Sequence, residues 1–158
     1  VGAFPTGMRN LRKFNLDSFI KEKVNHGIPL IGICLGMQML FENSTEFEFS
    51  EGLNLIKGNV KKIRNQKKIK LPHMGWNKLI SKPNNTSSLD NIFQYFVHSY
   101  AVYNTEPEEV IYECNYDKEK LVVGVKRDNI VGLQFHPERS GDAGITLLAE
   151  TIINLIRK

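Results

Sequence analysis

Apolar residues recur at every third or fourth position in two parts of the chain, which is the spacing of one face of an α-helix. The first part predicts a helix over residues 15–25, followed by Gly27 at a place where helices commonly end. The second part predicts a closing amphipathic helix over residues 145–156. The periodic positions are Leu16, Phe19, Ile20 and Val24 in the first part, and Ile145, Leu148, Ile152, Ile153 and Ile156 in the second.

A continuous apolar run over residues 28–33 precedes a segment of helix-forming residues at 35–42. An unbroken apolar run of this length is typical of a strand covered on both faces, and the segment after it predicts another helix. A helix, a buried strand of parallel type and a second helix in this order indicate a doubly wound, flavodoxin-like α/β sheet. The length of 158 residues fits a single domain over residues 1–158.

The middle of the chain holds short strand-like pieces in place of helical spacing. Residues 53–63 and 68–80 contain such pieces between glycine and proline breakers. The run 93–103 is rich in aromatic and β-branched residues and predicts one strand. The sequence LVVGVKRDNIVGLQFHPE predicts a hairpin that turns at Asp128 and Asn129. Together these pieces predict a mixed sheet with added antiparallel strands.

Two other segments carry weaker local signals. The opening residues VGAF are typical of a strand end that runs into a glycine turn, and PHMGWN at residues 72–77 is expected to form a loop.

Composition is typical of a globular protein, with 41% hydrophobic and 24% charged residues. No apolar segment approaches the roughly 20 residues that span a bilayer, so no membrane association is expected. Two cysteines do not make a disulfide framework, which favours a reducing, cytoplasmic location.

The net charge of +4 is concentrated in part in residues 57–70, which are rich in Lys and Arg and contain no acidic residue. A basic patch can attract nucleic acid or an anionic ligand. No aromatic residues interleave this patch as base-stacking platforms would, so no nucleic-acid binding is expected. The simplest interpretation is a solvated hairpin. The alternative is a docking surface for a partner or a phosphorylated ligand.

The pattern Gly32-x-Cys34-x-Gly36 stands where the buried strand gives way to the helix, and it matches a nucleophile elbow with Cys in place of Ser. The turn strains the nucleophile's backbone, and side chains two residues away would collide with neighbouring elements. Backbone N–H groups of the first helical turn would favour the thiolate and could hold an oxyanion. The alternative is a small apolar Cys with incidental glycines.

A thiol nucleophile needs a base, and LQFHPE at residues 133–138 contains one with an orienting group. His136 and Glu138 are two residues apart, so in an extended segment both point to one side and the carboxylate can hold the imidazole. Alone, a His-Pro-Glu tripeptide is ordinarily a surface loop. Together with the elbow at Cys34, it predicts an enzyme with a Cys-His-Glu triad. No histidine pair has metal-ligand spacing, so no metal site is expected.

The segments GICLGMQ, PHMGWN, FVHSY and GLQFHPE, in this order, resemble the class I, triad-type glutamine amidotransferases. PHMGWN and the opening VGAFPTGMRNL most resemble the glutaminase subunit of imidazole glycerol phosphate synthase. The resemblance covers essentially the whole chain and implies that fold, with no cofactor. It implies Cys34 as nucleophile, His136 as base and Glu138 as its orienter. It further implies an oxyanion hole from the backbone of Gly2 and Leu35, and glutamine binding by Gln38, Glu46, Ser99 and Tyr100.

The resemblance also implies a partner: a cyclase subunit in a heterodimer that uses the ammonia to make imidazole glycerol phosphate and AICAR in histidine biosynthesis. The expected docking residues are Pro72, Met74, Trp76 and Arg139, because exposed aromatic and Met side chains are typical interface anchors. The alternative is that the first three cap a core. Members of the family also carry roughly 45 to 50 more residues upstream, including the first strand of the doubly wound sheet and its helix.

Three rival functions stay open at this stage. A paralogous amidotransferase subunit could serve another synthase, such as one that modifies a surface sugar. A cysteine peptidase could use the same fold, although it would not need the Gln38 and FVHSY features. A non-catalytic binding subunit could have kept the fold, although an intact Cys34, His136 and Glu138 argue against it.

Overall fold

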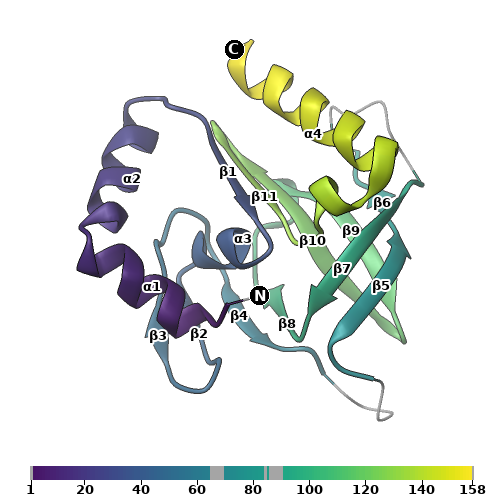
Figure 1. Ribbon diagram of the computed structural model, residues 1–158, viewed down its shortest axis with the longest axis horizontal. Helices are drawn as coiled ribbons and strands as arrows, with labels where there is room; N and C mark the ends of the chain where they lie inside the picture. Colours follow the sequence, from purple (N-terminus) through teal and green to yellow (C-terminus); the bar gives the residue numbers. More distant parts are fainter. Residues whose placement is uncertain (1, 65–69, 84, 86–90, 158) are drawn as a thin grey trace.

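The computed structural model describes residues 2–64, 70–83, 85 and 91–157 (Figure 1). It begins with two consecutive helices, α1 (Phe4–Lys13) and α2 (Leu16–Asn25), which lead into strand β1 (Leu30–Ile33). The expected strand end at VGAF lies partly outside the described residues: Gly2 and Ala3 are in neither a helix nor a strand, and α1 starts at Phe4 and buries Phe4 and Met8. Helix α2 and the left-handed glycine after it, Gly27 at φ +82°, follow the prediction.

In the part of the chain that the structure describes, the main sheet has nine strands, and it is mixed, as predicted. The order of its central path is β1-β11-β10-β8-β4-β2-β3, while β9 pairs with β10 and β6 pairs with β9. β1 runs parallel to β11, and β2 runs parallel to β4; the other pairs are antiparallel. The strands are β2 (Asn43–Ser44), β3 (Ser50–Glu51), β4 (Asn59–Lys62), β6 (Ile80–Ser81), β8 (Tyr100–Tyr103), β9 (Val110–Tyr116), β10 (Glu119–Arg127) and β11 (Ile130–Leu133).

Helices cover both faces of this sheet. α1, α2 and α3 (Leu35–Met39) pack on one face, in a core that includes Met37, Val125 and Ile130. α4 (Gly141–Ile156) packs on the opposite face through Leu147 and Leu155, against alternate residues of the same strands (Figure 1). Two short 3₁₀ turns, η1 (Pro107–Glu109) and η2 (Pro137–Arg139), complete the described elements. The hairpin between β10 and β11 turns at Asp128 and Asn129, as predicted.

The run 93–103 forms two strands, which corrects the expectation of one. β7 (Phe93–His98) pairs with β5 (His73–Lys78) in a separate two-stranded sheet, whereas β8 pairs with β4 and β10 in the main sheet. The chain changes sheets at Ser99. Local propensity is the same on both sides of this residue, so the break is decided by the pairing partners, which are distant in sequence.

PHMGWN was expected to form a loop, and this expectation is wrong, because residues 73–78 form β5. Directly opposite residues of an antiparallel pair share a face, so His73 faces His98 on the inner side and Trp76 lies beside Tyr95 on the outer side. The alternation of inward and outward residues is regular, but the inward residues His73, Gly75 and Asn77 are not apolar, which hides the pattern in the sequence. The predicted strand-like segment 68–80 and the basic segment 57–70 both lie partly outside the described residues. Within the described ranges, no helix has the length and apolar character needed to cross a membrane.

Candidate active site

Cys34 lies at a sharp turn between β1 and α3, with φ +53° and ψ −109°, a conformation that L side chains rarely adopt. The turn depends on Gly32, because a Cβ there would lie 2.7 Å from the backbone carbonyl of Gly36 and 2.8 Å from the amide nitrogen of Met37. A Cβ on Gly36 would meet nothing within 4 Å. The expected collision therefore holds at the first glycine of the pattern and is wrong at the second.

The Cys34 side chain is buried, with 6% of the residue exposed. Burial raises the pKa of its thiol above the ordinary value, whereas the backbone N–H of Leu35 lowers it. The helix-end effect expected from the sequence is thus present, but desolvation outweighs it. The expectation that the turn itself favours the thiolate is corrected: the resting group is a thiol, and it needs a base.

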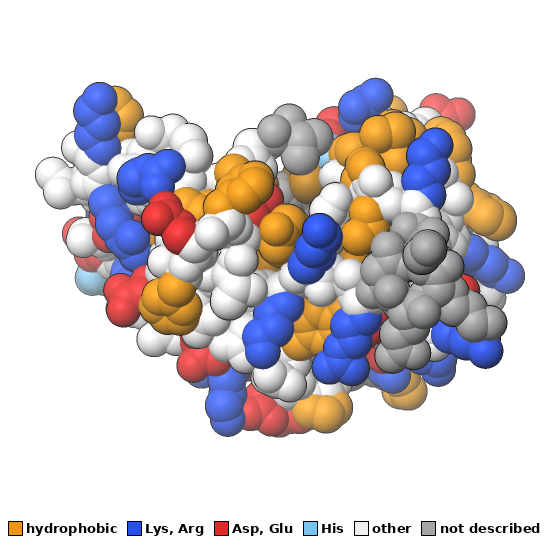
Figure 2. Space-filling view, turned by 90° about the horizontal axis from the view of Figure 1, so that it is seen from below, with side chains coloured by type: hydrophobic (Ala, Val, Ile, Leu, Met, Phe, Trp, Pro, Cys, Tyr) orange, Lys and Arg blue, Asp and Glu red, His pale blue; other side chains and the backbone are white. Residues whose placement is uncertain are grey.

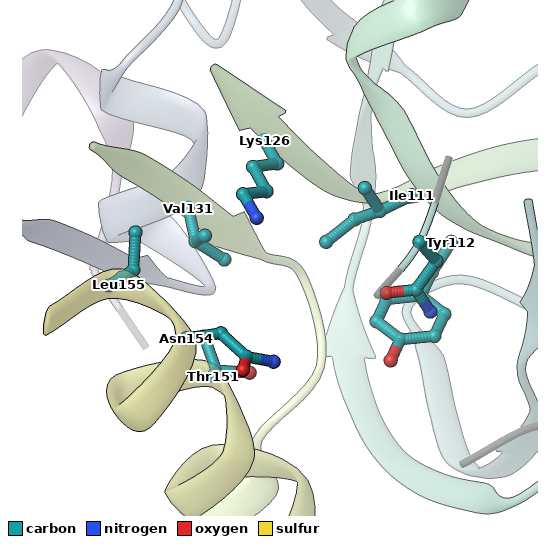
Figure 3. Close-up of a pocket in the computed structure, with 8 residues that line it drawn as sticks. Ile111, Tyr112, Lys126, Val131, Thr151, Asn154 and Leu155 are labelled. Atoms are coloured by element: carbon teal, nitrogen blue, oxygen red, sulfur yellow. The ribbon is translucent and has the colours of Figure 1, made fainter. Parts of the chain in front are cut away.

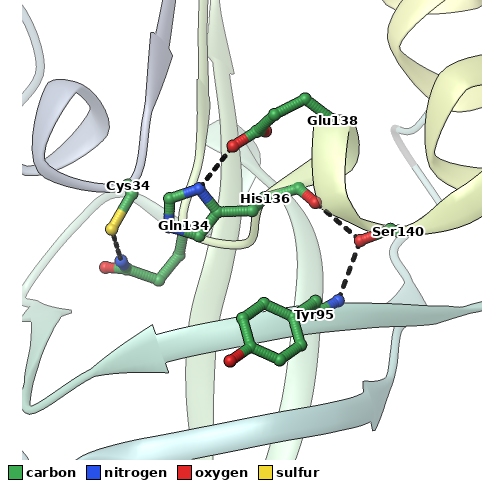
Figure 4. Close-up of polar contacts among 6 residues, drawn as sticks. All are labelled: Cys34, Tyr95, Gln134, His136, Glu138 and Ser140. Carbon is green, nitrogen blue, oxygen red and sulfur yellow. Dashed lines mark hydrogen bonds and ion pairs between the residues drawn. The ribbon is translucent and has the colours of Figure 1, made fainter. Parts of the chain in front are cut away.

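His136 lies three residues past the end of β11 and precedes the η2 turn, where Glu138 lies. Its Nδ1 is 2.6 Å from Oε1 of Glu138 (Figure 4). An extended segment was expected to bring the two side chains together; the structure uses a single 3₁₀ turn instead. Because Glu138 accepts at Nδ1, the proton of a neutral imidazole stays on Nδ1 and the lone pair is on Nε2. His136 Nε2 is buried and has no hydrogen-bond partner among the described residues.

The parallel pairing of β1 with β11 brings the two segments together, because the carboxyl ends of parallel strands lie at the same edge of a sheet. The backbone N–H of Cys34 donates to the carbonyl of Leu133 at 2.7 Å, which ties the elbow to the end of β11. In Figure 4 the imidazole of His136 lies between the Cys34 thiol and the Glu138 carboxylate. The negative charge of Glu138 also acts on the thiol, whose pKa it raises.

A cavity of about 40 Å³ opens beside the thiol. Most residues that the sequence singled out for an oxyanion hole and for substrate line it; the lining set is Gly2, Cys34, Leu35, Gln38, Glu46, Val97, His98 and Ser99. Tyr100 takes part through its carbonyl, which accepts from Gln38 Nε2 at 3.1 Å. Glu46 is partly engaged, because its Oε2 accepts the backbone N–H of Phe4 at 2.7 Å.

The expected docking residues lie on the outer side of the β5–β7 sheet or next to it. Met74 and Trp76 are 61% and 57% exposed, and Pro72 directly precedes β5. The guanidinium of Arg139 lies 4.7 Å from the ring centroid of Tyr95. Figure 2 shows hydrophobic side chains gathered among Lys and Arg on its right-hand part, where β5 and β7 lie in Figure 1. We call Met74, Trp76, Phe93, Tyr95 and Val97 the outer face; Val97 also lines the cavity beside Cys34.

Two residues of the site were not singled out in the sequence. Gln134 is fully buried, and its Nε2 lies 3.7 Å from the sulfur of Cys34. Ser140 donates to the carbonyl of His136 at 2.6 Å and accepts from the backbone N–H of Tyr95 at 2.9 Å, so it ties η2 to β7 (Figure 4). The sequence offered one signal for position 134: it precedes His136 by two residues, and in an extended segment residues two apart point to the same side.

Other candidate groups lie apart from this chemistry. The cavity in Figure 3, about 20 Å³ between α4 and strands β9 to β11, contains no member of the Cys34, His136 and Glu138 set. In the part of the chain that the structure describes, no three His, Cys, Asp or Glu side chains could hold a metal ion. Cys114 is buried in β9, where burial raises its pKa to about 12.

A thiol beside an imidazole that a carboxylate orients, with backbone N–H groups at the same cavity, can attack a carbonyl carbon and transfer a proton. The family model described as glutamine amidotransferase class-I matches residues 6–155. The chain belongs to this family.

Individual relatives of the chain are described more specifically than the family as a whole. The chain is 48% identical over 151 residues to the imidazole glycerol phosphate synthase subunit HisH of Lactococcus lactis, covering 94% of this chain and 73% of the relative. It is 43% identical over 152 residues to the HisH subunit of Thermotoga maritima, covering 96% and 72%. A solved structure described as a glutamine amidotransferase has the same fold, with a TM-score of 0.70 at 17% identity over 93% of this chain and 72% of that one.

Proposed function

We propose that this chain is the glutaminase subunit of an imidazole glycerol phosphate synthase. In this role it hydrolyses glutamine to glutamate and ammonia through Cys34, His136 and Glu138. The single observation that carries the proposal is the state of the His136 imidazole. One nitrogen is held by Glu138, and the other is buried without a partner among the described residues; the ring lies between the Glu138 carboxylate and the Cys34 thiol in Figure 4. An unpaired buried nitrogen is costly, so a proton-accepting role accounts for it.

The reaction follows from this arrangement. Nε2 of His136 takes the thiol proton as the sulfur of Cys34 bonds to the amide carbon of glutamine. The backbone N–H groups of Gly2 and Leu35 hold the resulting oxyanion. As the carbon–nitrogen bond breaks, His136 returns its proton to the leaving nitrogen and ammonia departs, leaving a glutamyl thioester. His136 then takes a proton from water, whose oxygen attacks the thioester, and the thiol is restored as glutamate leaves.

Glutamine binds in this proposal in the cavity beside the thiol. Glu46 keeps one carboxylate oxygen for the substrate ammonium, since the other accepts the N–H of Phe4. Gln38 lies one helical turn past Cys34 and donates to the carbonyl of Tyr100, and Ser99 lines the same cavity. A cavity of about 40 Å³ is smaller than glutamine, so binding has to move part of this wall.

The partner in this proposal is the cyclase subunit of the same synthase, joined in a cytoplasmic heterodimer. The outer face fits such a partner because it combines exposed aromatic and Met side chains with the mouth of the cavity. Ammonia released at Cys34 would then leave toward the partner and away from water. Pro72 and Arg139 flank this face, at the start of β5 and beside Tyr95.

The test is ammonia release from glutamine by the chain assembled with a cyclase subunit, with peptide cleavage measured in parallel. Cys34→Ser should lower ammonia release by at least about a thousandfold, because Cys34 is the one thiol among the described residues that line the cavity and a serine hydroxyl is a weaker nucleophile. Cys114→Ser is the matched control, a second buried cysteine outside the site, and should leave the rate unchanged. Peptide cleavage without glutamine hydrolysis would overturn the proposal in favour of a cysteine peptidase.

A further inference from the structure

A series of oriented hydrogen bonds connects the carbonyl of Tyr100 to the sulfur of Cys34. Gln38 Nε2 donates to this carbonyl at 3.1 Å and to Oε1 of Gln134 at 2.9 Å. Gln134 Nε2 in turn donates to the sulfur at 3.7 Å (Figure 4). Both glutamine side chains are buried, Gln38 at 5% and Gln134 at 0% exposure.

The Tyr100 carbonyl fixes the orientation of both glutamine side chains in this series of hydrogen bonds. A backbone carbonyl can only accept, so Gln38 must present its NH₂ group there. The same NH₂ group faces Gln134, which must therefore present its oxygen. Flipping Gln134 would set two NH₂ groups against each other in a buried site, at the cost of two unmade hydrogen bonds. The NH₂ group of Gln134 is thus held toward the sulfur.

A second, independent contact holds the Tyr100 carbonyl itself in place. His98 Nδ1 lies 2.8 Å from the Tyr100 carbonyl and must carry the proton there. His98 Nε2 then accepts from His73 Nδ1 at 3.0 Å. Both imidazoles are neutral at physiological pH, since burial lowers the pKa of His98 to about 4 and that of His73 to about 3. The carbonyl is therefore held from two sides by uncharged donors.

We infer that Gln134 is a positioning residue for the thiol: its amide, oriented through Gln38 by the Tyr100 carbonyl, donates to the Cys34 sulfur and stabilises the thiolate as His136 takes the proton. This inference rests on the proposed function for its catalytic consequence, but the hydrogen bond concerns the free thiol and can be measured without substrate. The hydrogen bond from Gln134 lowers the pKa of the Cys34 thiol, as the inference requires, whereas burial raises it. Charge-assisted hydrogen bonds are the strong ones, so the thiolate benefits more than the thiol.

Other titratable groups face the same sulfur and have to be kept constant in the test. His136 and Glu138 approach it from the segment after β11 (Figure 4). His98 from β7 and Glu46 from the loop after β2 line the same cavity. Substitutions confined to position 134 leave these groups in place, so in the uncharged variant Gln134→Met a change in the titration midpoint of the thiol reports the loss of the amide.

The experiment is the pH dependence of alkylation of Cys34 by iodoacetamide, without glutamine, with the modified residue identified by mass spectrometry. Gln134→Met removes the donor and should raise the midpoint by about one pH unit, a tenfold change in thiolate population. Gln134→Glu also adds a negative charge and should raise it further. The matched control is Gln94→Met, another fully buried glutamine, which has no hydrogen-bond partner among the described residues and should leave the midpoint unchanged.

Activity of the assembled enzyme adds a second readout. Gln134→Met should lower kcat roughly tenfold, the effect of losing one hydrogen bond to a charged atom, and change KM less than about threefold. Unchanged alkylation midpoints in both Gln134 variants, with circular dichroism and melting like the unmodified protein, would overturn the inference. A rise in KM alone would also overturn it and make Gln134 a substrate-binding group. If the proposed function failed, ammonia release would be missing even without substitution, while the alkylation midpoints would still shift.

Discussion

Acidification should destabilise this protein steeply, because two of its histidines are buried in the neutral form. His73 and His98 contact each other on the inner side of the β5–β7 sheet, 3.0 Å apart between Nδ1 and Nε2. Burial lowers the pKa of His73 from 6.5 to about 3, and that of His98 from 6.5 to about 4. The unfolded chain therefore binds more protons than the folded one between these values. Stability is fully present above pH 6.5 and is lost as the pH falls toward 4.

The magnitude follows from the two pKa values of each histidine. Between pH 7 and pH 5, each group costs about 2 kcal/mol of unfolding free energy, since the unfolded histidine is protonated and the folded one is not. The pair should thus cost about 4 kcal/mol, a large share of the roughly 5–15 kcal/mol typical of a domain. The greatest slope, for two protons, is about 2.7 kcal/mol per pH unit.

The assay is urea unfolding followed by far-ultraviolet circular dichroism at half-unit steps from pH 7.5 to pH 5. His98→Gln should lower stability at pH 7, because it removes the donor to the Tyr100 carbonyl, and should halve the slope against pH. His26→Gln changes an exposed histidine at the end of α2 and should leave the slope unchanged. Unfolding free energies that stay constant from pH 7 to pH 5, or an unaltered slope in His98→Gln, would refute the neutral buried pair.

Two further substitutions test the elbow and the outer face, each with a matched control. Gly32→Ala should lower the unfolding free energy by about 2–3 kcal/mol, because its Cβ would lie 2.7 Å from rigid backbone, whereas Gly36→Ala should change it by less than about 1 kcal/mol. Equal effects in urea unfolding would contradict the difference between the two glycines. Trp76→Ala should weaken assembly with the cyclase subunit about thirtyfold in a calorimetric titration, while Phe14→Ala, equally exposed at the end of α1, should not. If Trp76→Ala unfolded the free subunit and left its affinity for the cyclase subunit unchanged, a docking role for the outer face would be refuted.

The sequence predicted the elements whose signal is local. Helices α2 and α4 form where helical spacing predicted them, and β1 follows an unbroken apolar run. The face predicted for α4 is wrong, because Ile145, Ile152, Ile153 and Ile156 are exposed and the helix packs through Leu147 and Leu155 instead. The turn at Asp128 and Asn129 combines two residues that tolerate left-handed backbone, and Asp128 does adopt φ +50°. Helix α1 escaped notice because its buried face consists of few residues, and Pro5 and Gly7 interrupt it with weak helix formers.

Features that depend on distant pairing could not be predicted. Whether the run 93–103 forms one strand or two depends on β5, β4 and β10, none of which is adjacent in the sequence. The same pairing turns PHMGWN from an expected loop into a strand. The orientation of Gln134 depends on the carbonyl of Tyr100, 34 positions away, through a third side chain.

The site divides in the same way. The pattern around Cys34 and the spacing of His136 and Glu138 predicted these residues as the chemical groups of the site, because a nucleophile, a base and an orienting carboxylate each need a particular residue type. The protonation state of Cys34 did not follow, since desolvation is a property of the whole fold and outweighs the N–H of Leu35. Helix-end arguments made from sequence alone omit this opposing contribution.

The central claim is that glutamine chemistry takes place on the sulfur of Cys34 with the help of His136. The most direct measurement is labelling with a chloroketone analogue of glutamine, followed by peptide mapping of the adduct. We expect a single adduct on Cys34, suppressed by excess glutamine and formed at least about tenfold more slowly in His136→Ala. An adduct on any other residue, or ammonia release that continues after Cys34 is fully modified, would contradict it.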